Sequence, residues 1–266
     1  MKQQKIEFCN LFSGSSGNCS LVKTKHTKIL IDCGSSGKKI EESIHSIDEH
    51  LEDIDAILVT HEHVDHVQSL GLISSKYNIP VYANQETWNA MPKQSSKIED
   101  ENKLLFIPNE SFIINDILVE PFSIPHDAAN PCAFNFIAGE KKMSIATDLG
   151  HITEDIYEKL KGSIFALIES NYDTEILKVS RYPFSLKRRI SGPNGHLSNT
   201  NSAELICKLI KDDLKQVMLG HLSKENNFPE LAYQTAAEAM MNSNIDMNEI
   251  SLSVANRIKS SEIIKI

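Results

Sequence analysis

The chain has 266 residues, of which 41% are hydrophobic, and 27 Lys and Arg against 36 Asp and Glu give it a net charge of −9. This balance argues against a protein coated in basic charge for wrapping nucleic acid, although it leaves room for a local basic groove. No apolar run approaches the roughly 20 residues of a membrane helix.

Two features of the sequence bear on the cellular compartment. The N-terminal stretch 1–5 is charged and has no apolar run behind it, which predicts no signal peptide. Five scattered cysteines without a Cys-x-x-Cys pair predict reduced thiols. Together these features predict a cytoplasmic protein.

Short apolar runs bounded by turn residues predict strands, and longer periodic segments predict helices. In chain order, strands are expected at 6–11, 20–22, 28–34, 56–59, within 77–82, twice in 113–124, and at 134–137, 143–147, 165–168, 216–219 and 250–254. Helices are expected at 38–50, from Leu70 onward, and at 85–91, 152–161, 202–211 and 229–241. The loop 13–18 is either a hairpin connection, which we favour, or an anion-binding loop, and the polar stretch 93–102 is expected to be a mobile surface segment. No Pro-, Gly- or Ser-rich linker divides the chain, so we expect one α/β domain over residues 1–266, with two β-sheets packed face to face and helices on both outer sides.

The densest group of possible metal ligands is Thr-His-Glu-His-Val-Asp-His at 60–66, between an apolar strand and a helix. His61 and His63 are two residues apart, so on an extended loop both rings can point at one ion. Asp65 and His66 follow half a turn later and can serve a second ion. Imidazole and carboxylate suit zinc, and also manganese or iron. Two alternatives are a polar surface loop and the zinc-protease pattern His-Glu-x-x-His, but Asp65 stands where the second His of that pattern belongs.

The phrase His-x-His-x-Asp-His after an apolar strand resembles the signature motif of the metallo-β-lactamase fold superfamily. The resemblance implies a four-layer αββα sandwich that holds two divalent metal ions, zinc, manganese or iron. It also implies that Asp32, at the end of the strand 28–34, supports the metal-binding histidines.

The same resemblance implies three further ligands. His126 follows a strand, and Asp148 ends one, where its two oxygens can bridge two ions. Many members have Gly-His-Thr or Gly-His-Ser where this chain has Pro-His-Asp, which leaves a role for Asp127 open. Two Gly-His-Leu-Ser phrases offer the last ligand. We assign His221, because the apolar run 217–219 precedes it directly, whereas His196 follows a flexible loop.

The expected ligand sets are therefore His61, His63 and His126 for one ion, Asp65, His66 and His221 for the other, and Asp148 as the bridge.

A second pair of residues resembles nuclease branches of the superfamily, including enzymes that process tRNA. In those branches a strand ending in Glu-Ser or Glu-Ala lies upstream of a His-Ser-Thr or similar loop. Glu169 and His196 match these places. The resemblance implies that His196 acts on the substrate phosphate or the leaving oxygen and that Glu169 orients it. The order of all these phrases, over nearly the whole chain, resembles the YycJ/WalJ group, whose members resemble 5′-to-3′ DNA exonucleases.

A basic window lies between the two candidate catalytic segments. No Asp or Glu occurs between Ile176 and Ala203, and Tyr182 and Phe184 interleave with the basic residues, as stacking groups would. The alternative is a solvated basic loop, with Asn199 or Thr200 capping the following helix. We expect the following side chains to bind DNA: Arg181, Lys187, Arg188, Arg189 and Asn199.

The sequence thus predicts a dinuclear metal-dependent phosphodiesterase, namely a 5′-to-3′ DNA exonuclease. A hydroxide held between the ions would attack phosphorus, and Asp65 would aim it. One alternative is a hydrolase of a small ester, thioester or lactone on the same scaffold, which needs no basic groove. The other is a non-catalytic, metal-stabilised regulatory binding module.

Overall fold

The computed structural model describes residues 5–266, so the expectation about a signal peptide at the N-terminus falls largely outside the described residues. The chain divides into two compact units. The first contains the chain up to Ser123 together with Ala128–Lys141 and Asn256–Ile266, and the second contains Ile124–Asp127 and Lys142–Ala255. The prediction of one domain over residues 1–266 stays a prediction.

The main sheet of the first unit has the strand order β14-β1-β2-β3-β4-β5-β6. Its strands are β1 (Glu7–Phe12), β2 (Cys19–Lys23), β3 (Lys28–Ile31), β4 (Ala56–Leu58), β5 (Val81–Ala83), β6 (Lys103–Leu105) and β14 (Ile264–Lys265). The pairs from β14 to β3 are antiparallel and those from β3 to β6 are parallel, with Leu30 opposite Ile57. β4 is buried along its whole length, as expected of a parallel strand covered on both faces. The pairing of β1 with β2 confirms that the loop 13–18 is a hairpin connection.

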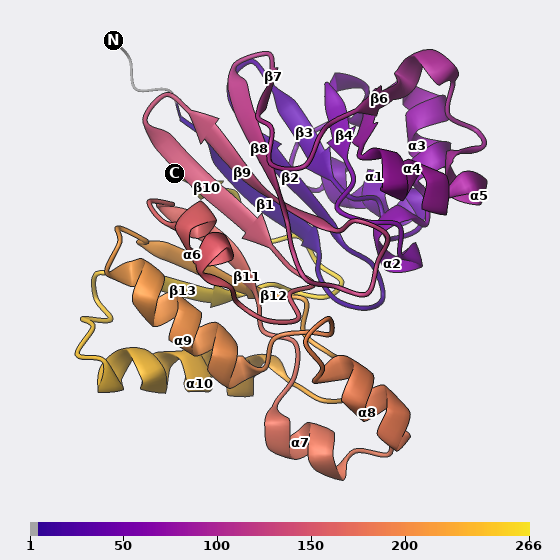
Figure 1. Cartoon of the computed structure of the whole chain (residues 1–266). Helices are drawn as coiled ribbons and strands as arrows, with labels where there is room; N and C mark the ends of the chain where they lie inside the picture. Colours follow the sequence, from indigo (N-terminus) through magenta and orange to yellow (C-terminus); the bar gives the residue numbers. More distant parts are fainter. Residues whose placement is uncertain (1–4) are drawn as a thin grey trace. The chain divides into compact units, whose positions relative to one another are not determined.

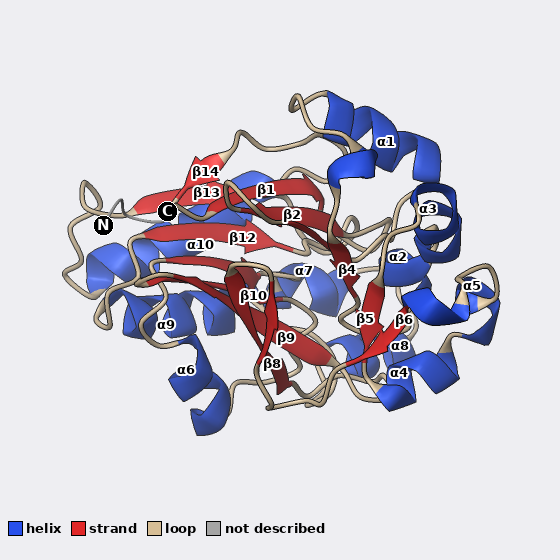
Figure 2. Cartoon of the chain, turned by 90° about the horizontal axis from the view of Figure 1, so that it is seen from above, coloured by secondary structure: helices blue, strands red, loops and turns tan. Residues whose placement is uncertain are grey.

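Helices of the first unit pack against this sheet. They are α1 (Gly37–His45), α2 (Val64–Val67), α3 (Leu70–Tyr77), α4 (Gln85–Ala90) and α5 (Pro92–Ser95), with single 3-10 turns at Leu51–Asp53 and Asp100–Asn102. Figure 2 shows α1 and α3 next to each other beside the sheet. Ile40 and Ile44 of α1 and Ile73 of α3 join Leu30 and Ile57 of the sheet in one buried core. The unit also contains the antiparallel strands β7 (Phe112–Ile114), β8 (Ile117–Ser123) and β9 (Cys132–Ala138).

The second unit consists of parallel strands connected by helices. β10 (Lys141–Ala146), β11 (Phe165–Glu169), β12 (Gln216–Gly220) and β13 (Ser251–Val254) pair in sequence order. The connecting helices are α6 (Glu154–Leu160), α7 (Thr174–Val179), α8 (Phe184–Ile190), α9 (Asn199–Ile210) and α10 (Pro229–Asn242). α9 and α10 run alongside each other next to β12 and β13, whereas α7 and α8 project from these strands (Figure 1). Because parallel strands place their carboxyl ends at one edge, the residues that follow β10, β11 and β12 meet there.

The fold class predicted from the sequence is confirmed, since the strands form two sheets and helices flank them. One expectation about local structure was wrong, because the helix expected at 38–50 ends at His45. The segment 93–102 contains most of α5 and a 3-10 turn, and its expected mobility stays a prediction. The basic window, for which a solvated loop was the alternative, contains the helices α7 and α8. Among residues 5–266, no helix is long and apolar enough to span a bilayer.

The close contact between α3 and α5 predicts that replacing Gly71 by alanine destabilises the protein, whereas the same replacement in an open helix stabilises one. A Cβ on Gly71 would lie 2.2 Å from the carbonyl oxygen of Gln94. Glycine to alanine in an open helix stabilises a protein by up to about 1 kcal/mol, but Gly71→Ala should lower the free energy of unfolding by about 1–3 kcal/mol because the helices must separate. Chemical denaturation measures this change. Ser75→Ala, on the exposed side of α3, is the control and should change stability by less than about 0.5 kcal/mol. A stabilising Gly71→Ala would contradict the close packing.

Candidate metal and catalytic centre

The first-unit cluster consists of His61, His63, Asp65 and His66, on the segment that leaves β4 and enters α2. His61 and His66 are fully buried. The distance between His61 Nε2 and His63 Nδ1 is 3.1 Å. Two nitrogens that bind one tetrahedral zinc ion lie about 3.3 Å apart. The geometry of this pair therefore fits a shared metal ion.

Asp32 and Thr60 fix which ring nitrogen of each histidine carries its proton. Asp32 accepts hydrogen bonds from the Thr60 backbone N–H (2.9 Å), the Thr60 hydroxyl (2.9 Å) and His66 Nδ1–H (2.7 Å). Because the Thr60 hydroxyl donates to Asp32, it can accept from His61 Nδ1–H at 3.0 Å. Both rings then carry the proton on Nδ1 and the lone pair on Nε2, which is the form that binds a metal ion.

Backbone contacts hold Asp65 and His66 against two other loops. The N–H of Asn18 donates to the carbonyl of Asp65 (2.8 Å), and the N–H of Cys33 donates to the carbonyl of His66 (2.8 Å). The side-chain amide of Asn18 lies 3.0 Å from His66 Nε2. A Cβ on Gly34 would lie 1.6 Å from the Asp65 carbonyl oxygen, so this approach requires glycine. Sequence analysis missed Asn18, Gly34 and Thr60, because their partners lie in other segments of the chain.

The second-unit cluster consists of His126, Asp148, Glu169, His196 and His221. Asp148, Glu169, His196 and His221 each offer an atom within 4.8 Å of the others. Asp148 and His221 have left-handed backbones (φ 61° and 55°), as Asp32 does in the first unit (φ 62°). Non-glycine residues adopt this conformation at an energetic cost, which is typical of functional sites.

Glu169 is the centre of this cluster. It is fully buried, and its Oε1 accepts hydrogen bonds from Nδ1–H of both His196 and His221 at 2.8 Å. Its Oε2 accepts from the backbone N–H groups of Leu149 (2.8 Å) and Leu197 (3.0 Å). Burial alone would raise the pKa of Glu169, but the charge on His196 and the hydrogen bonds from both histidines hold that pKa well below its usual value. Glu169 is therefore an ionised carboxylate whose oxygens are fully engaged.

The three histidines of this cluster differ in what surrounds them. His126 is buried and donates from Nδ1 to the carbonyl of Gly195 (3.0 Å), and burial lowers its pKa. Its Nε2 lies 3.6 Å from Asp148 Oδ1, and His221 Nδ1 lies 3.5 Å from the same oxygen. Burial would lower the pKa of His196, but the negative charge of Glu169 raises it above its usual value. The His196 side chain is also 20% exposed, whereas those of His126 and His221 are 2% exposed, so His196 is the most accessible of the three.

The donor sets of both clusters fit divalent metal ions. In each cluster a buried carboxylate fixes Nδ1–H of histidines, Asp32 in the first and Glu169 in the second, which leaves Nε2 to bind metal. Imidazole and carboxylate ligands suit zinc, manganese and iron.

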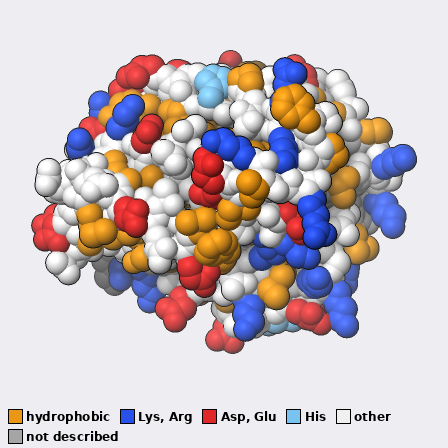
Figure 3. Space-filling model, turned by 90° about the horizontal axis from the view of Figure 1, so that it is seen from below, with side chains coloured by type: hydrophobic (Ala, Val, Ile, Leu, Met, Phe, Trp, Pro, Cys, Tyr) orange, Lys and Arg blue, Asp and Glu red, His pale blue; other side chains and the backbone are white. Residues whose placement is uncertain are grey.

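The basic arm, which we define as residues 174–190, contains α7 and α8. Every residue of α8 is at least partly exposed. Lys187 Nζ donates to the carbonyl of Lys178 (2.7 Å), the Arg188 guanidinium lies over the Phe184 ring, and Arg189 Nε donates to Asp127. Figure 3, a view from below, shows Lys and Arg side chains gathered mainly in the right half of the face, with acidic and hydrophobic side chains among them.

Asn199 has a different setting from the other expected DNA-binding residues. It is buried, and its amide oxygen accepts hydrogen bonds from the Ser170 hydroxyl (2.7 Å) and the Asn227 side chain (2.8 Å). Its expected contact with DNA stays a prediction. The cap of α9 is Ser198, whose hydroxyl accepts from the Asn201 N–H at 3.2 Å, so the alternative that Asn199 or Thr200 caps this helix is wrong.

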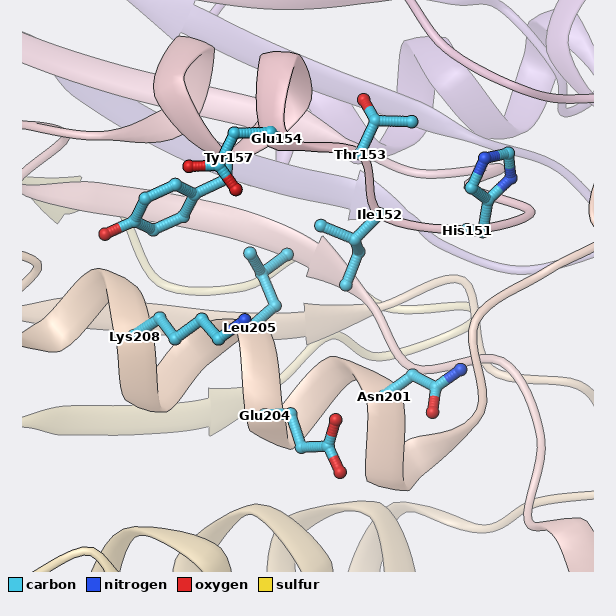
Figure 4. Close-up of a pocket in the computed structure, with 9 residues that line it drawn as sticks. All are labelled: His151, Ile152, Thr153, Glu154, Tyr157, Asn201, Glu204, Leu205 and Lys208. Carbon is cyan, nitrogen blue, oxygen red and sulfur yellow. The ribbon is translucent and has the colours of Figure 1, made fainter.

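A groove of about 520 Å³ lies between α6 and α9 in the second unit. Ile152 and Leu205 lie between the two helices, with His151 at one end and Tyr157 at the other (Figure 4). His151 Nδ1 donates to the carbonyl of Pro193 at 2.7 Å. This contact holds His151 against the loop before His196.

Comparison with known proteins identifies the family. The model of the metallo-beta-lactamase superfamily matches residues 13–196. The chain is 39% identical over 235 residues to a protein of Bacillus anthracis named exodeoxyribonuclease YycJ, with 88% of this chain and 89% of that protein covered. It is also 39% identical to exodeoxyribonuclease WalJ of Streptococcus pneumoniae serotype 2, with 88% of each chain covered. The chain belongs to the metallo-β-lactamase superfamily, and the resemblance to the YycJ/WalJ group is confirmed.

A solved structure agrees with this fold. The metallo-beta-lactamase fold protein YhfI from Bacillus subtilis has a TM-score of 0.71 to this chain at 14% identity, with 99% of this chain and all of that chain covered.

The contacts of Asp32 predict that it acts on metal affinity through His66. The substitution Asp32→Asn keeps the size of the side chain, and Asn tolerates the left-handed backbone. Its NH₂ group replaces one of the two acceptor oxygens, so the side chain can no longer accept all of the hydrogen bonds from His66 and Thr60. We expect affinity for zinc or manganese to fall by about 10- to 100-fold in a folded protein. Titration against a chromophoric chelator measures it. Asp48→Asn, at an exposed left-handed position (φ 56°), is the matched control. Equal losses in both variants would show that Asp32 has no specific role.

Proposed function

We propose that this protein is a dinuclear metal-dependent phosphodiesterase that degrades DNA in the 5′-to-3′ direction. The observation that carries the proposal is the Glu169 carboxylate, which hydrogen-bonds His196 and His221 at 2.8 Å each. It links the His assigned to the substrate to a His assigned to a metal ion. The exodeoxyribonuclease names of the two relatives, which match nearly the full length of both chains, support DNA as the substrate.

We further propose that the two clusters bind the same pair of ions. The ligands would be His61, His63, Asp65, His66, His126, Asp148 and His221. The donor geometry within each unit supports this assignment, and the order of the motifs in the family supports the pairing. Such ions, when bound, acidify water and neutralise charge on the phosphate.

Three side chains carry the remaining steps in this proposal. Asp65 accepts a hydrogen bond from the attacking water and orients it. Glu169 accepts the hydrogen bond from Nδ1–H of His196, and its negative charge raises the pKa of that ring. His196 then stabilises the negative oxygens of the transition state or gives a proton to the leaving oxygen.

The basic arm is the proposed DNA-binding surface, through Arg181, Lys187, Arg188 and Arg189. A chain with a net charge of −9 repels DNA in general. A local segment without acidic residues between Ile176 and Ala203 offsets this repulsion where the substrate binds. The proposed metals are zinc or manganese, or iron. The proposed compartment is the cytoplasm, where thiols stay reduced, and all five cysteines are buried free thiols.

Cleavage of labelled duplex DNA that carries a 5′-phosphate tests the proposed function, with added manganese or zinc. We expect release of nucleotides from the 5′ end, and Asp65→Ala should reduce it by about 100-fold or more because the water is no longer oriented. Turnover of a small ester, thioester or lactone without cleavage of DNA would favour the first alternative. A protein that turns over none of these substrates, and whose Asp65→Ala variant still binds its partner, would be the binding module.

A separate variant tests the role of His196. His196→Ala should keep the metal content of the wild type and lower kcat by about 100- to 10,000-fold, since proton transfer is lost while the metal ligands remain. Elemental analysis and single-turnover cleavage measure the two quantities. His45→Ala, on the exposed end of α1, is the control. If His196→Ala loses metal instead, His196 is a ligand and the assignments of His196 and His221 must be exchanged.

A further inference from the structure

We propose that the Asp127 carboxylate occupies the place that a phosphate of the substrate takes on Arg189. Asp127 holds Arg189 beside His126, and when DNA binds, Arg189 exchanges this carboxylate for a phosphate of the DNA. Asp127 is thereby a positioning residue, and Arg189 binds the substrate. The inference rests on the proposed function, because it takes DNA as the substrate and His126 as a metal ligand.

The geometry around His126 carries the first step. Because His126 Nδ1 donates to Gly195, its metal-binding nitrogen is Nε2. Asp127 Oδ1 lies 3.5 Å from this Nε2, and Asp127 Oδ2 accepts a hydrogen bond from Arg189 Nε. All three residues belong to the second unit. An anion that replaced the Asp127 carboxylate on Arg189 would therefore lie beside the proposed metal centre.

The exposure of the pair makes exchange possible. The Arg189 side chain is 59% exposed and that of Asp127 is 30% exposed, so water reaches both. Ion pairs of this kind contribute little to stability, because solvent screens the charges. A guanidinium has five donors in a planar fork that fits phosphate as well as carboxylate. A phosphate can thus take the place of Asp127 without disrupting the fold.

The neighbours of Arg189 on α8 are engaged differently. Lys187 Nζ donates to the backbone carbonyl of Lys178, and Arg188 lies over the ring of Phe184 at 5.9 Å. These contacts shape the basic arm itself, whereas the contact of Arg189 reaches the residue next to His126. Arg188 therefore provides a control with the same charge and helix but without this carboxylate.

The proposed exchange explains why the acidic residue Asp127 lies beside a site that would bind an anionic substrate. Without substrate, Asp127 neutralises Arg189 and holds its guanidinium at the residue next to His126, which reduces the conformational entropy lost on binding. A phosphate that displaces Asp127 leaves the carboxylate beside the metal centre. A neutral ester cannot compete for the guanidinium, so the pair favours substrates with a phosphate at this position.

Equilibrium binding tests the exchange without relying on turnover. The probe is a 5′-phosphorylated phosphorothioate oligonucleotide, which is bound to the metal-loaded protein and followed by fluorescence anisotropy at several salt concentrations. Asp127→Asn should bind about three- to fivefold more tightly than the wild type, because the competing charge is gone. Arg189→Ala should bind about tenfold more weakly, with the salt dependence reduced by about one phosphate contact. In the Arg189→Ala background, Asp127→Asn should have no effect.

Matched variants show whether the effect of Asp127 acts through Arg189. In the Arg188→Ala background, Asp127→Asn should still tighten binding. Weaker binding by Asp127→Asn, or tighter binding that persists without Arg189, would overturn the exchange. Loss of metal from Asp127→Asn would make Asp127 a ligand and would also overturn it. Thermal unfolding checks that each variant is folded.

A second probe separates this inference from the proposed function. If the wild type neither binds nor cleaves DNA, the proposed function fails, and calorimetric titration with inorganic phosphate then tests the exchange. Tighter phosphate binding by Asp127→Asn and weaker binding by Arg189→Ala, each relative to the wild type, would support Arg189 as a phosphate-binding residue for which Asp127 competes. Equal affinity for phosphate in the wild type, Asp127→Asn and Arg189→Ala would refute it.

Discussion

The second unit depends on one buried carboxylate, that of Glu169. Its two oxygens accept four hydrogen bonds, two from histidine rings and two from backbone N–H groups. These donors come from the turn after β10, the loop before α9 and the end of β12. An unpaired carboxylate in this position would cost several kcal/mol, on the order of what a whole domain gains on folding. The buried charge is stabilised because donors from these segments surround it, and the same hydrogen bonds orient the two histidines.

The first unit also contains a buried carboxylate that is stabilised by neighbouring hydrogen-bond donors. Asp32 is buried at the end of a parallel-paired strand and accepts from the Thr60 backbone, the Thr60 hydroxyl and the His66 ring. Asp32, Asp148 and His221 share a left-handed backbone directly beyond strands. That conformation turns a side chain sharply at the edge of a sheet, and the surrounding hydrogen bonds offset its cost. Each cluster is therefore held by a rigid sheet and one anchoring carboxylate, rather than by the flexible loops alone.

The basic arm carries a charge opposite to the net charge of the whole chain. The chain is acidic overall, yet the arm formed by α7 and α8 has five basic residues from Lys178 to Arg189 and no acidic residue after Glu175. Phosphate binding requires such local concentration of charge, because a uniform negative surface repels the substrate. Asp127 moderates this charge at one point, where Arg189 reaches the residue beside His126. The arm thus combines a local excess of positive charge with a defined position for one of its guanidinium groups.

The sequence by itself determined most strands, most helices, the family and the cluster of possible metal ligands at 61–66, because these depend on local spacing and on the alternation of apolar residues. Only the tertiary structure decided that Glu169 bonds two histidines, that Ser198 caps α9, that the basic window is helical and that Arg189 pairs with Asp127. The roles of Asn18 and Gly34 also emerged only there. Apart from the cap of α9, these side-chain contacts join residues tens of positions apart. They are set by how loops pack at the edge of a sheet, and no short-range periodicity in the sequence records that packing.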